Sequence, residues 1–199
     1  MTTIWAKRAL IALSAAFLGL SSQAAFAAVQ IQPFLCAQSG DGSNAGWVTV
    51  QNKRVIGVTV QRVGDSGGGK FVGLSGVPGN SVVTVGTIKN SLSANVDMKL
   101  TLTTSANQTL TVNPTSSAGT NYTFTLANYG LTSKVQITAL AVFAQNITGS
   151  PGSIFLAEFV LNGKNETNQL NSISGCPSAL GEPPPPNKGK FWPSPANNH

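Results

Sequence analysis

Between residues 28 and 176 the sequence is a succession of short segments in which apolar and polar residues alternate. The clearest of them is 96–103, where Val, Met and two Leu residues alternate with Asp, Lys and two Thr residues. A period of two is typical of a β-strand with one buried and one solvated face. The pattern therefore predicts a half-buried strand there, and about nine or ten short strands over the whole region.

Two neighbouring runs rich in β-branched residues, 47–51 and 55–63, flank residues 52–54 and predict a β-hairpin. The stretch 64–69 that follows is rich in glycine. Because glycine reaches turn conformations at little steric cost, this stretch predicts a flexible loop between strands.

The most apolar segments of the chain, 135–143 and 154–161, predict central strands. We expect them to pair with each other across the loop at 146–152. Turn-forming residues recur at short intervals and no long internal repeat is present, which excludes a solenoid or a propeller. The sequence thus predicts an all-β fold, a single antiparallel β-sandwich or jelly-roll-like domain over residues 28–176.

The first 27 residues have the pattern of a secretory signal peptide. Lys7 and Arg8 form a short positive region, an apolar run follows at 9–20, and an Ala-x-Ala pattern ends the segment at 25–27. The apolar run is shorter than the roughly 20 residues that a membrane-spanning helix needs. We therefore expect an exported chain that begins at residue 28 and has no integral membrane span. It would be found in the periplasm, at the cell surface or outside the cell.

Residues 177–199 differ in composition from the region before them and predict a Pro-rich tail outside the domain. Four consecutive prolines at 183–186 favour an extended polyproline II segment. Phe191 and Trp192 form a large apolar pair in an otherwise polar stretch, and aromatic residues are favoured anchors in protein interfaces. The pair is a candidate site for docking to a protein partner, against the simpler interpretation of a loose chain end.

The chain has two cysteines, Cys36 and Cys176, near the two ends of the predicted domain. In an exported protein an even number of cysteines predicts a disulfide. A bond between them would join the first strand to the last element of the domain. An intermolecular bridge and a catalytic thiol are the alternatives, but a redox pair favours a C-x-x-C spacing and a thiol protease needs a histidine.

Charged residues make up only 9% of the chain, whereas a typical soluble domain has about 25%. This scarcity excludes coiled coils and long helical bundles, and the 41% of hydrophobic residues excludes a charge-rich disordered chain. The formal net charge is +6, and it falls to +4 without Lys7 and Arg8. The only local cluster of basic residues is Lys53 and Arg54, with Arg62 nearby, and it is too small to predict a nucleic-acid partner.

Residues 64–68 read GDSGG, which resembles the segment around the nucleophile of chymotrypsin-like serine proteases. A serine nucleophile needs a general base, usually histidine, and in that family the histidine precedes the serine. The one histidine here is His199, the last residue of the sequence. A hydrolase is therefore a distant alternative, and we predict no catalytic residues.

Acidic and metal-ligating residues are equally scarce. Residues 41–44 have a superficial likeness to a calcium-binding loop, but Asn52 stands where the EF-hand pattern needs glutamate. With six acidic residues, two cysteines and one histidine, we predict no metal site and no cofactor beyond a weak oxygen-ligand site in that loop. Glu158 interrupts an apolar strand, and strand alternation places it on the outer face rather than in the core.

The leading functional hypothesis is a non-enzymatic structural or adhesive protein of the cell envelope, such as a subunit of a surface assembly or secretion machine. It predicts a protein partner or self-association. Val29, Ile31 and Leu35 alternate before Cys36 and are candidates for a strand given to a neighbouring subunit, as in strand-donating pilins. The long cysteine spacing and the Pro-rich C-terminus depart from that family, so no family is assigned.

The alternative hypothesis is a monomeric extracytoplasmic module that binds a glycan or a protein ligand. Aromatic side chains, with Trp47 and Tyr122 as candidates, would supply the contact surface. Self-association separates the two hypotheses, because the first predicts an assembly and the second predicts a monomer.

Overall fold

The computed structural model describes residues 28–38, 40–88, 93–172, 175–177 and 180, and the statements below refer to these residues. They form 13 β-strands and one 3-10 helix, Leu126–Tyr129. Within these residues there is no helix that is long and apolar enough to cross a membrane. Ten strands have four residues or more, in line with the sequence prediction, and three are shorter. In chain order the strands are β1 (Gln30–Cys36), β2 (Asn44–Val50), β3 (Lys53–Val60), β4 (Ser66–Val72), β5 (Val77–Pro78), β6 (Val82–Thr87), β7 (Val96–Thr104), β8 (Thr109–Val112), β9 (Ser116–Ala118), β10 (Asn121–Thr125), β11 (Gln136–Asn146), β12 (Gly152–Leu161) and β13 (Lys164–Asn165).

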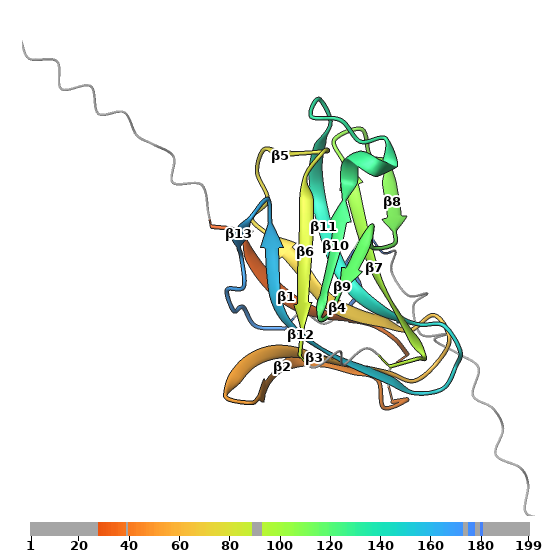
Figure 1. The fold of residues 1–199 in the computed structure, drawn as a ribbon. Coiled ribbons are helices and arrows are strands. Elements are labelled where there is room, and N and C mark those ends of the chain that lie inside the picture. Colours follow the sequence, from red (N-terminus) through yellow and green to blue (C-terminus); the bar gives the residue numbers. More distant parts are fainter. Residues whose placement is uncertain (1–27, 39, 89–92, 173–174, 178–179, 181–199) are drawn as a thin grey trace, which may run out of the picture.

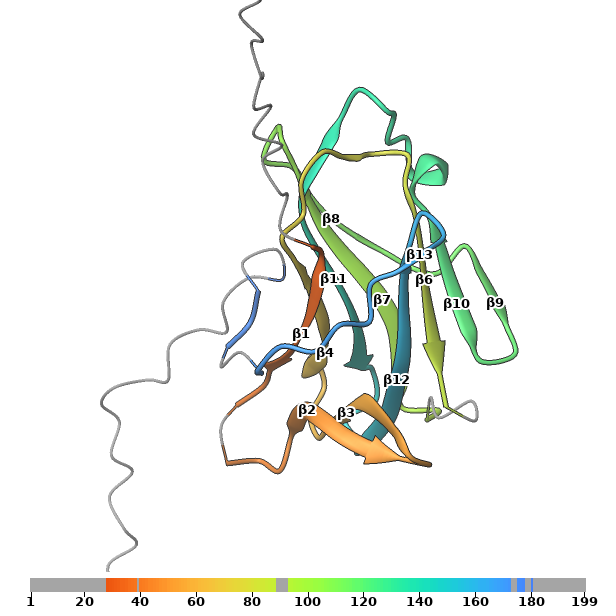
Figure 2. The ribbon, with the colours of Figure 1, turned by 90° about the vertical axis from the view of Figure 1, so that its left-hand side faces the viewer.

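The strands form two sheets that face each other (Figures 1 and 2). Sheet A has the order β1-β4-β11-β7-β8, with β5 paired to β11, and sheet B has the order β2-β3-β12-β6-β10-β9, with β13 paired to β12. Every ladder between these strands is antiparallel. The fold is a β-sandwich, which confirms the fold class predicted from the sequence.

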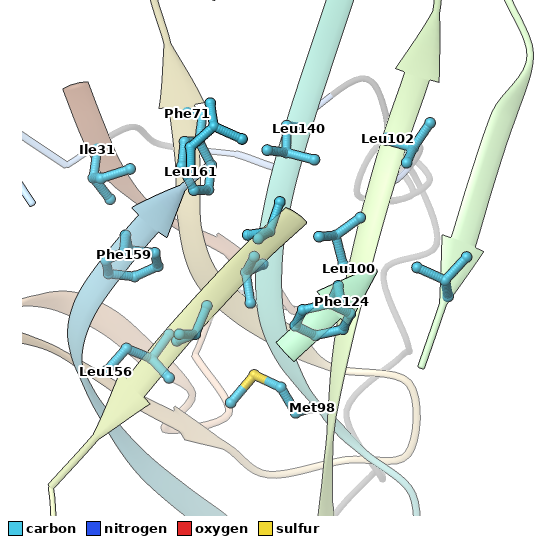
Figure 3. Close-up of a cluster of buried hydrophobic side chains, with 14 of the residues drawn as sticks. Ile31, Phe71, Met98, Leu100, Leu102, Phe124, Leu140, Leu156, Phe159 and Leu161 are labelled. Atoms are coloured by element: carbon cyan, nitrogen blue, oxygen red, sulfur yellow. The ribbon is translucent and has the colours of Figure 1, made fainter. Parts of the chain in front are cut away.

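The space between the sheets is filled by apolar side chains from both (Figure 3). The four apolar residues of the alternating segment 96–103 are all buried in β7, which confirms the period-two prediction. The rings of Phe71 from sheet A and Phe159 from sheet B meet edge to face, with centroids 6.1 Å apart. Burying each large apolar side chain contributes about 1.5–3 kcal/mol relative to leaving it exposed, so this layer dominates the stability of the fold.

The two most apolar strands, β11 and β12, are central strands as predicted, but the prediction that they pair with each other is wrong. β11 lies between β4 and β7 in sheet A, whereas β12 lies between β3 and β6 in sheet B. The connection at 147–151 crosses from one sheet to the other instead of closing a hairpin. Each strand is apolar because it is the middle of its own sheet, so hydrophobicity indicates a central position and not a partner.

The glycine-rich stretch is largely a strand, and the prediction of a loop over 64–69 is wrong from Ser66 onward. Ser66–Val72 form β4, which pairs with β1 on one side and β11 on the other. On the inner face, a Cβ at Gly69 would lie 2.7 Å from the ring of Phe159. In the register, Gly68 stands between Phe34 and Phe143, whose rings meet edge to face with centroids 6.3 Å apart. A Cβ at Gly68 would lie 2.1 Å from the carbonyl oxygen of Val142, so glycine makes room for neighbouring backbone at this position and for an aromatic ring at Gly69.

Along the edge of the sandwich formed by β1 and β2, the chain that follows β13 runs between the two sheets, as Figure 2 shows. We call residues 166–172 the strap and this edge the closed flank. The N–H of Ile31 donates to the carbonyl of Asn168 at 3.2 Å. The indole N–H of Trp47 donates to the carbonyl of Leu170. Cys176 then forms a disulfide with Cys36 of β1, with their Cα atoms 4.7 Å apart.

Candidate functional site: a polar cleft at the open flank

The opposite edge of the sandwich, which we call the open flank, is formed by β8 of sheet A and β9 of sheet B. Residues 113–115 carry the chain from one strand to the other. Pro114 has no N–H group, so the β8 ladder cannot continue through it. Thr115 fixes the crossover: its N–H and its hydroxyl donate to the carbonyl of Thr123 at 2.7 and 2.9 Å, and the hydroxyl accepts from the N–H of Thr125 at 3.0 Å.

A cleft of about 420 Å³ lies at this crossover, where β7 of sheet A faces β9 and β10 of sheet B. Small-molecule sites in proteins usually have volumes of about 300–1,000 Å³. The cleft is lined by eight residues: Asp97, Met98, Asn113, Pro114, Thr115, Ser116, Ser117 and Tyr122. Six of the eight have polar side chains, so the cleft suits a ligand that is rich in hydroxyl or amide groups.

The charged groups beside the cleft neutralise each other. The ammonium group of Lys99 lies 3.3 Å from a carboxylate oxygen of Asp97, and it donates to the side-chain oxygen of Asn113 at 2.7 Å. A half-exposed pair of this kind adds little to the stability of the fold. Its effect is on the cleft, because it fixes the positions of Asp97 and Asn113 without leaving a net charge there.

Three hydroxyl groups of the lining have no partner among the described residues and are available to a ligand. Two belong to Ser116 and Ser117, which are exposed on β9. The third is the phenol of Tyr122, whose ring packs against the edge of the core. Burial raises the pKa of this phenol above its ordinary value of 10.0, so Tyr122 remains a neutral hydrogen-bond donor near neutral pH.

The two aromatic residues that the sequence suggests as ligand contacts have different surroundings. Tyr122 lines the cleft. Trp47 lies at the closed flank, where its indole N–H donates to Leu170 and the guanidinium of Arg54 lies 6.0 Å from the ring centroid. Trp47 therefore contributes to the packing of the strap, and Tyr122 is the aromatic residue placed to meet a ligand.

The segment suggested for donation to a neighbour pairs within its own chain. β1 pairs with β4 along its whole length, from Gln30 to Cys36. Ile31 is fully buried in the core, and Val29 and Leu35 are partly buried. Donation of this strand to another subunit would have to break that ladder. Phe191 and Trp192, the suggested docking pair, lie outside the described residues.

The segment that resembles a protease nucleophile is part of a strand rather than an exposed turn. Ser66 is 5% exposed and lies opposite Cys36 and Gln145 in the register. Glu158 is exposed, as predicted, although a register shift between Leu156 and Glu158 interrupts the strict alternation of β12 at this point. Its carboxylate accepts a hydrogen bond from the side chain of Asn165 at 2.9 Å. Neither residue lines the cleft.

Of the residues that line the cleft, sequence reasoning suggests Tyr122 alone as a ligand contact. Asp97, Asn113 and Ser117 have the sequence character of ordinary strand and turn residues. The one signal near them is the pair of Asn113 and Pro114, which ends a strand and marks a crossover. That β7 and β10 lie beside this crossover depends on the order of strands in the sheets, which the sequence does not contain.

Comparison with known proteins adds no family to this picture. No protein-family model matches the chain, and no curated protein has a matching sequence. The function must therefore be inferred from the chemistry of the cleft.

Proposed function

We propose that this chain is an exported, non-enzymatic adhesive protein of the cell envelope that holds a carbohydrate in the cleft of the open flank. The observation that carries the proposal is the lining, in which the hydroxyls of Ser116, Ser117 and Tyr122, which bond to none of the described residues, lie beside the amide of Asn113. Sugars present closely spaced hydroxyl groups that both donate and accept hydrogen bonds, so they match such a lining.

The charge balance of the cleft favours a neutral sugar. Asp97 and Lys99 already pair with each other at 3.3 Å. An acidic ligand would compete with Asp97 for the ammonium group, and a basic ligand would compete with Lys99 for the carboxylate. A neutral ligand leaves the pair intact and meets no repulsion from either charge.

The lining also favours binding over catalysis. Glycoside hydrolysis generally needs two carboxyl groups, one on each side of the scissile bond. Asp97 is the one carboxyl group among the eight residues of the lining, and its charge is paired with Lys99. We therefore propose that a bound carbohydrate is retained and not cleaved.

Two further features support export. The first 27 residues have the pattern of a signal peptide. The disulfide between Cys36 and Cys176 is of a kind that persists in oxidising compartments and is rare in the cytosol.

The test is a glycan-binding measurement on the chain from residue 28 onward, with the disulfide intact. We expect retention on an array of neutral oligosaccharides, and a measurable affinity by calorimetry for the best of them. Tyr122→Phe combined with Ser117→Ala removes two hydroxyls from the lining, and we expect the affinity to fall about 5- to 100-fold.

Trp47→Phe is the matched control, because it changes an aromatic residue outside the cleft and should leave the affinity unchanged. The proposal is wrong if no glycan is retained, or if the double variant binds as tightly as the unaltered chain. Thermal unfolding of each variant shows whether a loss of binding comes from the cleft or from loss of the fold.

A second candidate function, self-association into a surface assembly, is favoured by the edge of β2, which the strap contacts through Trp47 without pairing with it as a strand. No other described strand pairs with this edge of sheet B, and Val48 on it is 38% exposed. An exposed edge strand can pair with a strand of another chain. Light scattering on the purified chain tests this candidate: a monomer at all concentrations contradicts it, and an oligomer that Val48→Lys dissociates supports it.

A further inference from the structure

Two carboxylates lie together where the β1–β2 and β3–β4 connections meet at one end of the sandwich. Ser43 links them, because its N–H donates to Oδ1 of Asp41 at 2.8 Å and its hydroxyl donates to Oδ2 of Asp65 at 2.8 Å. The side chain of Asp41 is 3% exposed, and Asp65 is buried.

One oxygen of this pair has no hydrogen-bond donor. Oδ2 of Asp41 is the one buried side-chain oxygen or nitrogen without such a partner among the described residues. A buried, charged oxygen left in this state is costly, and its usual explanation is a bound ion or an ordered water. Oδ2 of Asp65, by contrast, also accepts from the N–H groups of Gln61 and Arg62 at 3.3 and 2.9 Å.

The guanidinium of Arg62 does not balance the negative charges of the two carboxylates. Its Nε lies 3.8 Å from Oδ2 of Asp41, which is beyond hydrogen-bond range, and its side chain is 56% exposed. Another of its nitrogens donates to the side-chain oxygen of Gln38. One mostly solvated positive charge therefore faces two buried negative charges, which leaves a net charge of −1 in the cluster.

We propose that this cluster binds a hard divalent cation of the calcium class, with Oδ2 of Asp41 as its first ligand. Oxygen atoms of Asp65 and Gln38 lie in the same cluster, and carboxylate and amide oxygens are the ligands that calcium prefers. The cluster offers no sulfur or imidazole ligand that would favour a transition metal. The site is separate from the carbohydrate cleft, so the two proposals can fail independently.

The expected affinity is modest, since two carboxylates and neutral oxygens are a small set of charged ligands. Calcium sites of extracellular modules have dissociation constants of about 0.1–1 mM. With calcium at about 10 mM, such a site should raise the midpoint of thermal unfolding by about 3–11 °C.

The experiment compares thermal unfolding of the chain from residue 28 onward in calcium chloride, in a chelator, and in sodium chloride of equal ionic strength. Asp41→Asn removes the charge and keeps an oxygen that accepts from Ser43. Glu158→Gln is the control, because it neutralises an exposed carboxylate far from the loops. We expect the calcium-dependent shift in the unaltered chain and in Glu158→Gln, and its loss in Asp41→Asn. No shift, or an equal shift in Asp41→Asn, overturns the proposal.

Arg62→Gln provides a second readout that does not depend on the stability of Asp41→Asn. If a cation binds the pair, removal of the competing guanidinium should leave calcium affinity by calorimetry equal to or tighter than that of the unaltered chain. If Arg62 is instead the only partner that the carboxylates need, Arg62→Gln should unfold at a lower temperature and show no calcium binding, which also overturns the proposal.

Discussion

The two flanks of the sandwich are the sides where the edge strands of the two sheets meet, and they are built from different kinds of residue. At the closed flank the strap inserts between β1 and β2, and buried contacts, backbone hydrogen bonds and a disulfide hold it (Figure 2). At the open flank the chain crosses directly from β8 to β9, and hydroxyl and amide groups line the cleft that remains.

This difference between the flanks suggests that the closed flank stabilises the fold and that the open flank binds a ligand. The closed flank fixes the two ends of the domain, because Cys36 and Cys176 are 140 positions apart in the sequence. At the open flank, β9 is exposed along its whole length and carries Ser116 and Ser117. Substitutions at the closed flank should therefore change the free energy of unfolding, and substitutions at the open flank should change ligand binding alone.

The largest expected effect comes from removal of the disulfide. Cys36→Ser with Cys176→Ser should lower the free energy of unfolding by about 2–5 kcal/mol, because the crosslink closes a long loop in the unfolded chain. Urea unfolding followed by fluorescence measures the change, with the reduced unaltered chain as the control. Stability equal to that of the oxidised chain would mean that the closed flank does not depend on the bond.

The next largest effect is expected beside the closed flank, on β4. Gly69→Ala places a Cβ 2.7 Å from the ring of Phe159 and should cost about 1–3 kcal/mol of stability through overpacking. Phe159→Leu removes part of that ring, so the double variant should be less destabilised than the sum of the two single variants. Additive effects in this cycle would contradict a direct clash between the two positions.

A smaller effect is expected from the strap contact of Trp47. Trp47→Phe keeps an aromatic ring but removes the N–H that donates to the carbonyl of Leu170. The carbonyl then loses a partner, and stability should fall by about 1 kcal/mol. Hydrogen exchange of the Ile31 amide, which donates to the strap at Asn168, should become faster in this variant. Unchanged exchange would show that the strap is held without Trp47.

The core strands and the disulfide of the closed flank follow from the sequence, whereas the strap, its contact with Trp47 and the open flank do not. The alternation in β7 and the hydrophobicity of β11 and β12 are local properties, so the sequence predicts strands and central positions correctly. Pairing is not local: β11 and β12 lie in different sheets because a short connection can cross between sheets as well as turn within one.

The glycine run shows a second limit of sequence reasoning. Gly67, Gly68 and Gly69 have the composition of a loop, yet they form a strand whose neighbours leave no room for side chains. A Cβ would lie 2.9 Å from Val58 at the first position, 2.1 Å from the carbonyl oxygen of Val142 at the second and 2.7 Å from the ring of Phe159 at the third. The candidate site likewise depends on contacts between segments that are far apart in the sequence. Ser116 and Ser117 become parts of a cleft only because β9 and β10 face β7 across the crossover, which depends on the order of both sheets.

The smallest expected effect on stability is at the open flank, and it is the sharpest test of the comparison. Ser116 and Ser117 are exposed and their hydroxyls bond to no described residue, so Ser116→Ala with Ser117→Ala should change the free energy of unfolding by less than about 0.5 kcal/mol. The same double variant should lose carbohydrate affinity, because both hydroxyls line the cleft. Urea unfolding and calorimetric titration measured on one preparation check the two statements together. A marked loss of stability would show that the open flank helps to hold the sandwich together, and stability and binding would then not be divided between the two flanks.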